Sequence, residues 1–342
     1  MIKVSIDASG GDIGISVNIP AGIDALNSFA DLFIYFVGDE TVISHELTKY
    51  KTTKLRNRFA IIHASEVIDM SDKPAIALRR KKDSSMRIAI NLVKDNIANA
   101  CVSSGNTGAL MAISRFVLKT IPGIDRPAIM GKLPTFNGHT HMLDLGANVD
   151  SSASDLLEFA VMGSVAISEI ENIEKPTIGL LNIGEEEVKG NEKIKQTAQL
   201  LKNSSLNYYG FIEGDDIYKG TVDVVICDGF EGNIALKASE GVIKLMSSGI
   251  KEAFTKNIFR KILALIAMPA LKDFKSKIDP GQYNGASLLG LRGIVIKSHG
   301  SATKKEFWHA IAEARIEVKA KIAEKIAYKV ELELEKSITN NV

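Results

Sequence analysis

A glycine-rich segment near the N-terminus has the residue types that can bind an anion. Asp7–Asp12 follows a short β-branched run and contains the adjacent Gly10 and Gly11. Paired glycines let backbone N–H groups approach an anion, and a following helix adds the positive end of its dipole. The spacing is not G-x-G-x-x-G, so a nicotinamide site has little support. We expect either part of a phosphate site, with Asp7 positioning the substrate, or only a tight strand-to-helix turn.

The segment Ser103–Gly108 is a stronger candidate for binding phosphate. A buried strand would bring hydroxyls, a row of backbone amides and the start of a helix to one point. We therefore expect Gly105, Asn106 and Thr107 to bind phosphate. The alternative is that Asn106 or Thr107 simply caps the helix.

Three further segments place acid, amide and basic side chains at the ends of other expected strands. They are 144–150 with Asp144 and Asn148, 228–233 with Asp228 and Asn233, and 297–300 with Lys297 and His299. Such groups converging at neighbouring strand ends are typical of an active-site crevice. Each residue alone is a weak signal, because a single aspartate after a strand is more often a helix cap.

The elements that position these side chains alternate along the chain. Short apolar runs such as 222–227 (VDVVIC) are typical of strands buried on both faces, hence of a parallel sheet. Helix-like stretches lie between them, for example 84–95, 154–170 and 304–330. The pattern predicts an α/β fold: a doubly wound, mostly parallel sheet in an α/β/α sandwich, with residues 1–342 as a single domain. Ligands bind such sheets at the carboxyl ends of strands.

Residues 250–278 depart from this pattern and predict a protruding amphipathic helical hairpin inserted in the domain. Apolar residues recur at helical spacing, Pro269 interrupts them, and basic residues flank the run. We expect the tip to lie around Leu263, Ile266, Met268 and Leu271 and to contact a membrane surface. The alternative is a hairpin that packs in the core or against a dimer partner.

The run Arg79, Arg80, Lys81 and Lys82 is the longest block of positive charge. Such a run is often only a solvated face, but it could also meet a polyanionic partner or a phosphate. The acidic segment 185–187 is better explained by a helix dipole than by a metal, because no complete ligand set accompanies it.

Composition narrows the functional class. The formal net charge of +1 and the 6% aromatic content disfavour a nucleic-acid binder. Two cysteines without a CxxC pair give no support for a zinc cluster or a redox dithiol and fit a reducing cytosol. The apolar run 262–271 is far shorter than a membrane-spanning helix needs, and we expect no signal peptide.

Motifs over about residues 3–320 resemble one family closely, the bacterial phosphate acyltransferase of phospholipid synthesis (PlsX). They include 77–86 (ALRRKKDSSM), 104–111 (SGNTGALM), 144–150 (DLGANVD), 179–187 (GLLNIGEEE) and 296–300 (IKSHG). The chain departs from the family at Ser9, where methionine is usual, and at 151–153 (SSA), where Cys-Lys-Pro is usual. The segment 13–20 also replaces a short Ala-Pro turn.

The resemblance implies transfer of a fatty acyl group from acyl-acyl carrier protein to inorganic phosphate, giving acyl phosphate for phospholipid synthesis. It implies a phosphotransacetylase-like fold, no metal or cofactor, and a cytoplasmic homodimer associated peripherally with the inner face of the cell membrane. The product would pass to a glycerol-3-phosphate acyltransferase. Two alternatives remain: a phosphotransacetylase-like enzyme for short-chain acyl-CoA, and a non-catalytic membrane-associated scaffold that binds carrier protein.

Because phosphate is itself the nucleophile, this chemistry needs positioning and oxyanion stabilisation rather than a protein nucleophile. We expect catalytic roles for Asn106, Lys297, His299 and Asp228, and phosphate binding by Gly10, Gly11, Gly105, Asn106 and Thr107. Asp7, Asp144, Asn148 and Asn233 are expected to position the substrate or stabilise the oxyanion. The basic run 79–82 is expected to bind the acidic carrier protein.

Overall fold

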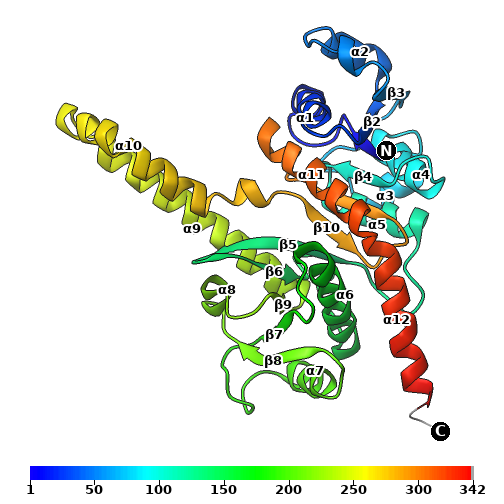
Figure 1. Cartoon of the computed structure of the whole chain (residues 1–342), viewed down its shortest axis with the longest axis vertical. Coiled ribbons are helices and arrows are strands. Elements are labelled where there is room, and N and C mark those ends of the chain that lie inside the picture. The colour runs from blue at the N-terminus through cyan, green and yellow to red at the C-terminus, as the bar shows by residue number, and fades with distance from the viewer. Residues whose placement is uncertain (340–342) are drawn as a thin grey trace.

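The computed structural model describes residues 1–339, and eleven strands in this range form one sheet (Figure 1). The order across the sheet is β3-β2-β1-β4-β11-β10-β5-β6-β9-β7-β8. The strand bounds are β1 Ile2–Asp7, β2 Leu32–Gly38, β3 Phe59–His63, β4 Ala100–Ser103, β5 Ala128–Thr135, β6 Gly138–Leu143, β7 Thr177–Leu181, β8 Asn207–Ile212, β9 Val224–Ile226, β10 Ala286–Leu289 and β11 Ile294–Lys297. Because the sheet is continuous, we propose that the chain is a single domain.

Helices cover both faces of this sheet, which confirms the expected α/β/α architecture. Their bounds are α1 Ile15–Ser28, α2 Glu40–Leu47, α3 Pro74–Arg80, α4 Ser85–Lys94, α5 Thr107–Leu118, α6 Ala153–Glu171, α7 Glu192–Lys202, α8 Asp216–Lys219, α9 Gly229–Thr255, α10 Ile258–Ile278, α11 Lys304–Ala320 and α12 Ile322–Thr339. The single helix expected over 304–330 is two helices, because Lys321 adopts a left-handed backbone that ends α11.

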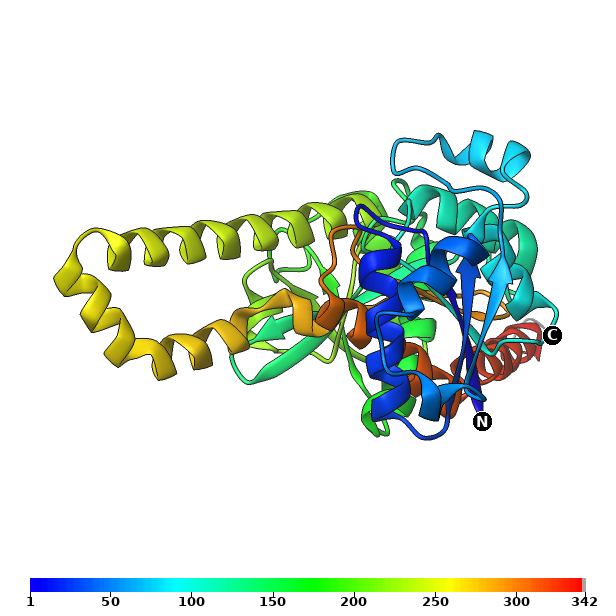
Figure 2. The same ribbon diagram turned by 90° about the horizontal axis from the view of Figure 1, so that it is seen from above.

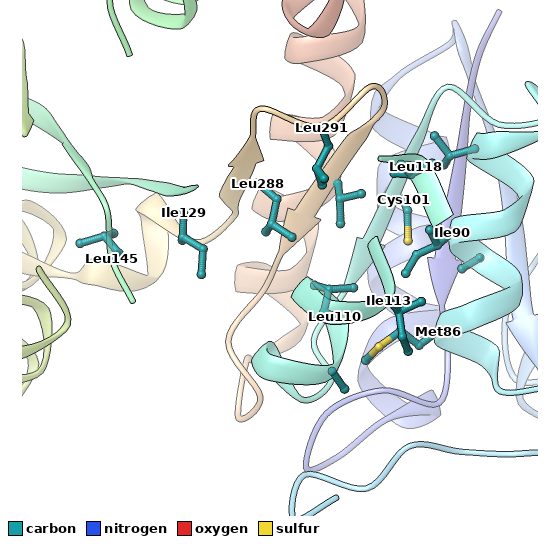
Figure 3. Close-up of a cluster of buried hydrophobic side chains, with 14 of the residues drawn as sticks. Met86, Ile90, Cys101, Leu110, Ile113, Leu118, Ile129, Leu145, Leu288 and Leu291 are labelled. Atoms are coloured by element: carbon teal, nitrogen blue, oxygen red, sulfur yellow. The ribbon is translucent and has the colours of Figure 1, made fainter. Parts of the chain in front are cut away.

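Three apolar clusters hold the layers together. Cluster one joins α4 and α5 to one face of the sheet, and Met86, Ile90, Leu110 and Ile113 from these helices meet Cys101 of β4 (Figure 3). A second lies between α1, α11 and the other face, and a third under α6 and α12. Both cysteines are free and buried, so they serve as small apolar side chains.

Strands β5, β8 and β10 have no counterpart in the sequence analysis. β5 pairs antiparallel with both β10 and β6, and these three strands join two parallel sets. Because β5 contains Gly131, Lys132 and Pro134, it lacks the continuous apolar run that marks the buried parallel strands.

The helical hairpin protrudes from the sheet as two long helices, α9 and α10 (Figures 1 and 2). It is longer than the expected 250–278, because α9 begins at Gly229. The expected tip is wrong: the chain reverses at Lys256 and Asn257, where the Asn257 side chain caps α10 by accepting a hydrogen bond from the N–H of Arg260 (3.0 Å). Pro269 lies inside α10, which continues past it.

The residues expected at the tip lie along α10. Leu263, Ile266 and Met268 are exposed and Leu271 is half-buried. Within residues 1–339, none of the helices combines the length and the apolar character that crossing a bilayer requires.

Candidate active site

The two parallel sets of strands run in opposite directions and end near the same line across the sheet. Lys297, the last residue of β11, pairs with Ala286 of β10, which is level with Gly131 of β5. Leu143, the last residue of β6, pairs with Met130 of β5. The carboxyl ends of both sets therefore converge at the central strands, as the sequence analysis expected of a crevice.

A cleft of about 840 Å³ lies at this junction, against β5 and the base of the hairpin. Four predicted site residues line it: Thr107, Asn233, Lys297 and His299. Gly146, from the predicted segment 144–150, lines it as well. Apolar side chains line much of the rest, among them Leu133, Leu145, Leu236, Ile243 and Ile278, with charged side chains such as Lys132 and Lys244 between them. The part of the cleft around Thr107, Lys297 and His299 is called its polar end below.

The glycine-rich segment after β1 packs directly on the segment after β4. A Cβ on Gly10 would lie 2.4 Å from Asp7 Oδ2 and 3.0 Å from the amide nitrogen of Gly105. Gly11 has a positive φ of 90°, and a Cβ there would lie 2.6 Å from Ser104 Oγ. Only glycine fits both positions, so these two residues bring the segments together.

Asp7 is buried behind this contact and accepts hydrogen bonds from two serines. Ser85 Oγ donates to Oδ1 and Ser103 Oγ donates to Oδ2, each at 2.6 Å. Burial raises the pKa of the Asp7 carboxyl, and the two hydroxyls and the nearby Lys297 ammonium partly offset that rise. Asp7 does not line the cleft, so it acts on the site through its neighbours.

Lys297 brings a cation to the polar end of the cleft. Its ammonium donates to the carbonyl oxygens of Ser104 (3.5 Å) and Ser298. Burial lowers the pKa of Lys297 to about 8, although the Asp7 charge opposes the shift. In most molecules the Lys297 side chain is therefore still protonated at neutral pH. A buried cation of this kind favours an anionic ligand beside it.

Asn106 has a clear structural role. Its Oδ1 caps α5 by accepting from the N–H of Ala109 (3.0 Å), and its Nδ2 donates to the carbonyl oxygens of Met70 (2.8 Å) and Asp72 (3.0 Å). The side chain therefore ties the loop before α3 to the start of α5. Thr107, the next residue, is exposed at this helix N-terminus and lines the cleft.

His299 also lines the cleft, half exposed and next to α9. Its Nε2 lies 3.4 Å from Glu240 Oε1 and 3.4 Å from Lys237 Nζ. The Asn284 side chain accepts from the His299 N–H (2.9 Å) and donates to Ser298 Oγ (2.8 Å), which fixes the loop after β11. The imidazole is thus held beside the cleft by two other elements.

Asp144 is buried after β6 and accepts five N–H donors. Oδ1 accepts from the backbone of Ile129, Gly146 and Ala147 at 3.0–3.1 Å. Oδ2 accepts from the backbone (2.8 Å) and side-chain (2.9 Å) nitrogens of Asn148. Burial raises the pKa of Asp144, while these donors favour its charged form. Asp144 and Asn148 thus stabilise the loop beneath the cleft and do not line the cleft themselves.

Asp228 caps α9 and forms an ion pair. It accepts from the N–H groups of Phe230 (2.9 Å) and Ser151 (2.8 Å) and from Lys193 Nζ (2.8 Å). Burial opposes its ionisation, but the Lys193 ammonium and the N–H groups outweigh it and lower the pKa of Asp228. Asn233, one turn along α9, reaches the cleft.

The cleft and the Asp7 network also use residues that the sequence analysis did not single out: Ser85, Lys237, Glu240 and Asn284. Lys193 is a further such residue, which pairs with Asp228 outside the cleft. A signal existed for Ser85, which lies in the family-like motif 77–86. Lys237 and Glu240 follow the segment 228–233 on α9, but spacing alone does not show which side chains of that helix face the cleft. Asn284 lies on a segment for which the sequence predicts no site residue.

The basic run splits into two kinds of side chain. Lys81 donates to the carbonyl oxygen of Val67 (2.7 Å) and to Asp72 (2.6 Å), and its pKa is raised mainly by the hydrogen bond to Asp72. Arg79, Arg80 and Lys82 are exposed. Only these three keep side chains presented to a partner.

Comparison with known proteins gives the same family from sequence. The family model described as "Fatty acid synthesis protein" matches residues 2–325. A phosphate acyltransferase from Ruthia magnifica is 67% identical over 98% of each chain. Those from Hydrogenovibrio crunogenus and Legionella pneumophila (strain Paris) are 56% and 57% identical, covering 98% and 94% of this chain and 99% and 94% of theirs.

Solved structures share the fold at low identity. The EutD phosphotransacetylase from Staphylococcus aureus has a TM-score of 0.58 and 14% identity over 94% of each chain. A phosphotransacetylase from Streptococcus pyogenes has a TM-score of 0.56 and 19% identity, covering 96% of this chain and 94% of that one. With the family match, they confirm both the expected fold and the resemblance: the chain belongs to the fatty acid synthesis protein family of phosphate acyltransferases and is an enzyme that transfers acyl groups to phosphate in phospholipid synthesis.

Proposed function

We propose that the acyl donor of this enzyme is acyl-acyl carrier protein and that the reaction takes place in the cleft at Lys297. The observation that supports this most is the mixed lining of the cleft. It combines a buried ammonium and a helix N-terminus with apolar side chains. The first suits inorganic phosphate and the second suits a fatty acyl chain.

Phosphate binds, in this proposal, between Lys297 and the N-terminus of α5 at Thr107. The first N–H groups of an α-helix lack partners within the helix, so they are free to donate to an anion. Gly10, Gly11 and Gly105 shape this end, and Asn106 and Asp7 act as positioning residues. The ammonium of Lys297 offsets the charge of the phosphate as it approaches the thioester.

A phosphate oxygen then attacks the thioester carbonyl carbon. The C–O bond forms, the carbonyl oxygen gains charge, and the C–S bond breaks to give acyl phosphate and a carrier thiolate. We assign to His299 the proton that the sulfur takes up, and to Asn233 a hydrogen bond to the developing oxyanion. Asp144, Asn148 and Asp228 maintain the loops beneath.

A trapping assay tests this reaction. Purified protein is incubated with long-chain acyl-acyl carrier protein, with and without phosphate, and hydroxylamine captures any acyl phosphate as a hydroxamate. We expect thiol release that depends on phosphate and a matching amount of hydroxamate. Short-chain acyl-CoA serves as the rival donor, and a strong preference for it would overturn the assignment of the donor. Thiol release that is independent of phosphate would overturn the reaction itself.

The acidic carrier protein is proposed to dock against Arg79, Arg80 and Lys82. Exposed charge pairs are screened over about 10 Å at 0.1 M salt, so the association should weaken as salt rises. Arg79→Glu with Lys82→Glu should weaken carrier binding and leave folding intact. The matched control is Lys175→Glu with Lys195→Glu, two exposed lysines on the other half of the sheet. Equal binding by both double variants would remove this surface from the proposal.

The hairpin is proposed to rest on the inner face of the cell membrane. Exposed apolar residues along α10 include Ile258, Phe259, Leu263 and Ile266, with exposed lysines and arginines among them. Apolar burial in the interface would supply part of the binding, and each cation near an anionic surface about 1 kcal/mol more.

Leu263→Glu with Ile266→Glu should reduce co-sedimentation with anionic vesicles while activity in solution persists. Phe136→Glu with Val188→Glu is the control, because both side chains are 78% exposed and lie outside the hairpin. We also propose a cytoplasmic homodimer that passes its product to a glycerol-3-phosphate acyltransferase. If the hairpin variant instead dissociates the dimer in sedimentation, the hairpin is a subunit interface and the membrane proposal fails.

A further inference from the structure

A second cluster of chemically reactive side chains lies outside the cleft, where strand β6 meets the C-terminal end of α6. His139 and His141 are two residues apart on β6 and therefore point to the same face of the sheet. Glu171, the last residue of α6, meets both: its Oε1 lies 3.0 Å from His139 Nε2 and 3.7 Å from His141 Nε2. The ligand atoms of all three lie within 4.8 Å of one another.

His141 gives an independent indication that a partner is missing from this cluster. The residue is only 2% exposed, and its Nε2 has no hydrogen-bond partner among the described residues. An unpaired buried polar atom costs about 1–3 kcal/mol, so native proteins nearly always pair such atoms with protein, water or an ion. The unpaired nitrogen faces the carboxylate of Glu171, so an ion bound between the two would supply a partner for each.

The donor atoms of the cluster suit a cation. Zn²⁺ binds the lone pair of an imidazole nitrogen and the oxygen of a carboxylate. Such an ion would replace the proton shared between His139 Nε2 and Glu171 Oε1, which lie 3.0 Å apart, and that proton would be released on binding.

Lys132 is the one described cation within salt-bridge distance of Glu171, and it has a second partner. Its Nζ lies 3.6 Å from Glu171 Oε1 but 3.3 Å from Glu313 Oε2 on α11. Glu317, on the same helix, is fully buried, and burial raises its pKa to about 8. When Lys132 pairs with Glu313, the carboxylate of Glu171 is left for an ion.

We propose that His139, His141 and Glu171 bind a divalent transition-metal ion, of which Zn²⁺ fits best. Two imidazoles and one carboxylate form a known zinc ligand set, with donors at 2.0–2.2 Å from the metal. Donors at that distance in a tetrahedron are roughly 3.3 Å apart, between the two separations seen here. Imidazole with carboxylate also favours Zn²⁺ over Ca²⁺ or Mg²⁺, which prefer oxygen ligands.

The ion would join β6 to the end of α6, with an open position toward solvent on the side of the partly exposed His139 and Glu171. The sequence gives little warning of this, because Glu171 follows His141 by thirty residues and only the fold brings them together. The inference does not depend on the acyl donor proposed above.

Metal binding by untagged full-length protein tests the site. Calorimetric titration with Zn²⁺ should show one strong site per chain, and Co²⁺ should give visible ligand-field bands that Zn²⁺ removes. His141→Ala should weaken Zn²⁺ binding by roughly a hundredfold or more. Saturating Zn²⁺ should raise the melting temperature of the wild type by a few degrees and leave that of the variant unchanged. His45→Ala, at an exposed histidine on α2, is the control.

His141→Ala leaves a buried gap, so circular dichroism must first show that the variant folds. If it does not, His139→Gln decides the question, because that side chain is partly exposed and its loss leaves the core intact. The proposal is overturned if the wild type shows no saturable Zn²⁺ site. It is also overturned if the folded variants bind Zn²⁺ as tightly as the His45→Ala control.

Discussion

Asp7 and Asp144 occupy equivalent places in the two halves of the sheet, yet their surroundings differ. Each is a buried aspartate at the end of a strand that leads into a glycine-containing loop. Asp144 accepts five N–H groups, all within fixed backbone or the Asn148 amide. Asp7 accepts two rotatable hydroxyls and lies near the cation of Lys297. The donors around Asp144 hold a loop in place, whereas Asp7 adjusts the charge of Lys297 at the cleft.

The largest effect should follow from changing the aspartate that fixes a loop. Asp144→Asn keeps one acceptor oxygen but turns an amide donor toward the two N–H groups of Asn148. Leaving these partly buried donors unpaired beside a buried side chain should lower the free energy of unfolding by about 3 kcal/mol. Urea unfolding measures this change in the free energy of unfolding. Asp150→Asn is the control, because Asp150 lies in the same loop and is exposed. A loss as small as the control's would mean that the loop tolerates the change.

The corresponding change at Asp7 should affect activity more than stability. Hydroxyls can turn to donate to or accept from an amide, so Asp7→Asn should change the free energy of unfolding by less than about 1 kcal/mol. Loss of the negative charge beside Lys297 should reduce acyl transfer to phosphate about tenfold, which is about 1.4 kcal/mol. Stability and initial rates measured on the same sample check this. If the two aspartate variants lose stability equally, the contrast drawn between the halves is wrong.

Much of the fold could be predicted from the sequence, because buried parallel strands such as β9 leave continuous apolar runs. The central strand β5 could not, because its Gly131 and Lys132 serve the cleft and a side-chain network rather than a two-sided core. The apolar spacing predicts the hairpin. It places the tip wrongly, because Pro269 looks like a break in the pattern, whereas this exposed proline lies inside α10 and leaves the helix continuous.

The candidate site divides in the same way. Lys297, Thr107 and His299 reach the cleft as their positions at strand and helix ends suggest. Asn106 has the same kind of position, but its side chain is occupied by the loop at 69–72, which is far away in sequence. Position at a strand end can be inferred from spacing, whereas the partners that occupy a side chain depend on the tertiary structure.

The pH dependence of the reaction should report the charge of Lys297. Its ammonium has a pKa of about 8, so the rate should fall above that pH, approaching tenfold per unit. Because the Asp7 charge raises this pKa, the alkaline limb of Asp7→Asn should move to lower pH. A purely structural role for Asp7 would leave the limb in place. Rates measured from pH 6 to about pH 10 with buffer-matched controls separate the two.

The stability of the protein should change in the opposite sense over the same range. The pKa of Lys297 in the folded state, about 8, lies below the ordinary lysine value of 10.5, so the folded protein releases the proton first. Unfolded chains then hold more protons between these values, and stability rises with pH there. Lys297→Met should abolish this contribution, visible as a smaller rise in the free energy of unfolding than in the wild type.

The central claim is that phosphate binds at the polar end of the cleft. The phosphate dependence of the Lys297→Met enzyme tests this claim most directly. Initial rates of acyl phosphate formation are measured against phosphate concentration at saturating acyl-acyl carrier protein. Lys244→Met, which removes another cleft lysine further along α9, is the control. We predict that Lys297→Met raises the phosphate KM or lowers kcat by tenfold or more, roughly 1.4 kcal/mol per decade, while the control stays near the wild type. Unchanged phosphate kinetics in a folded Lys297→Met enzyme would contradict the account.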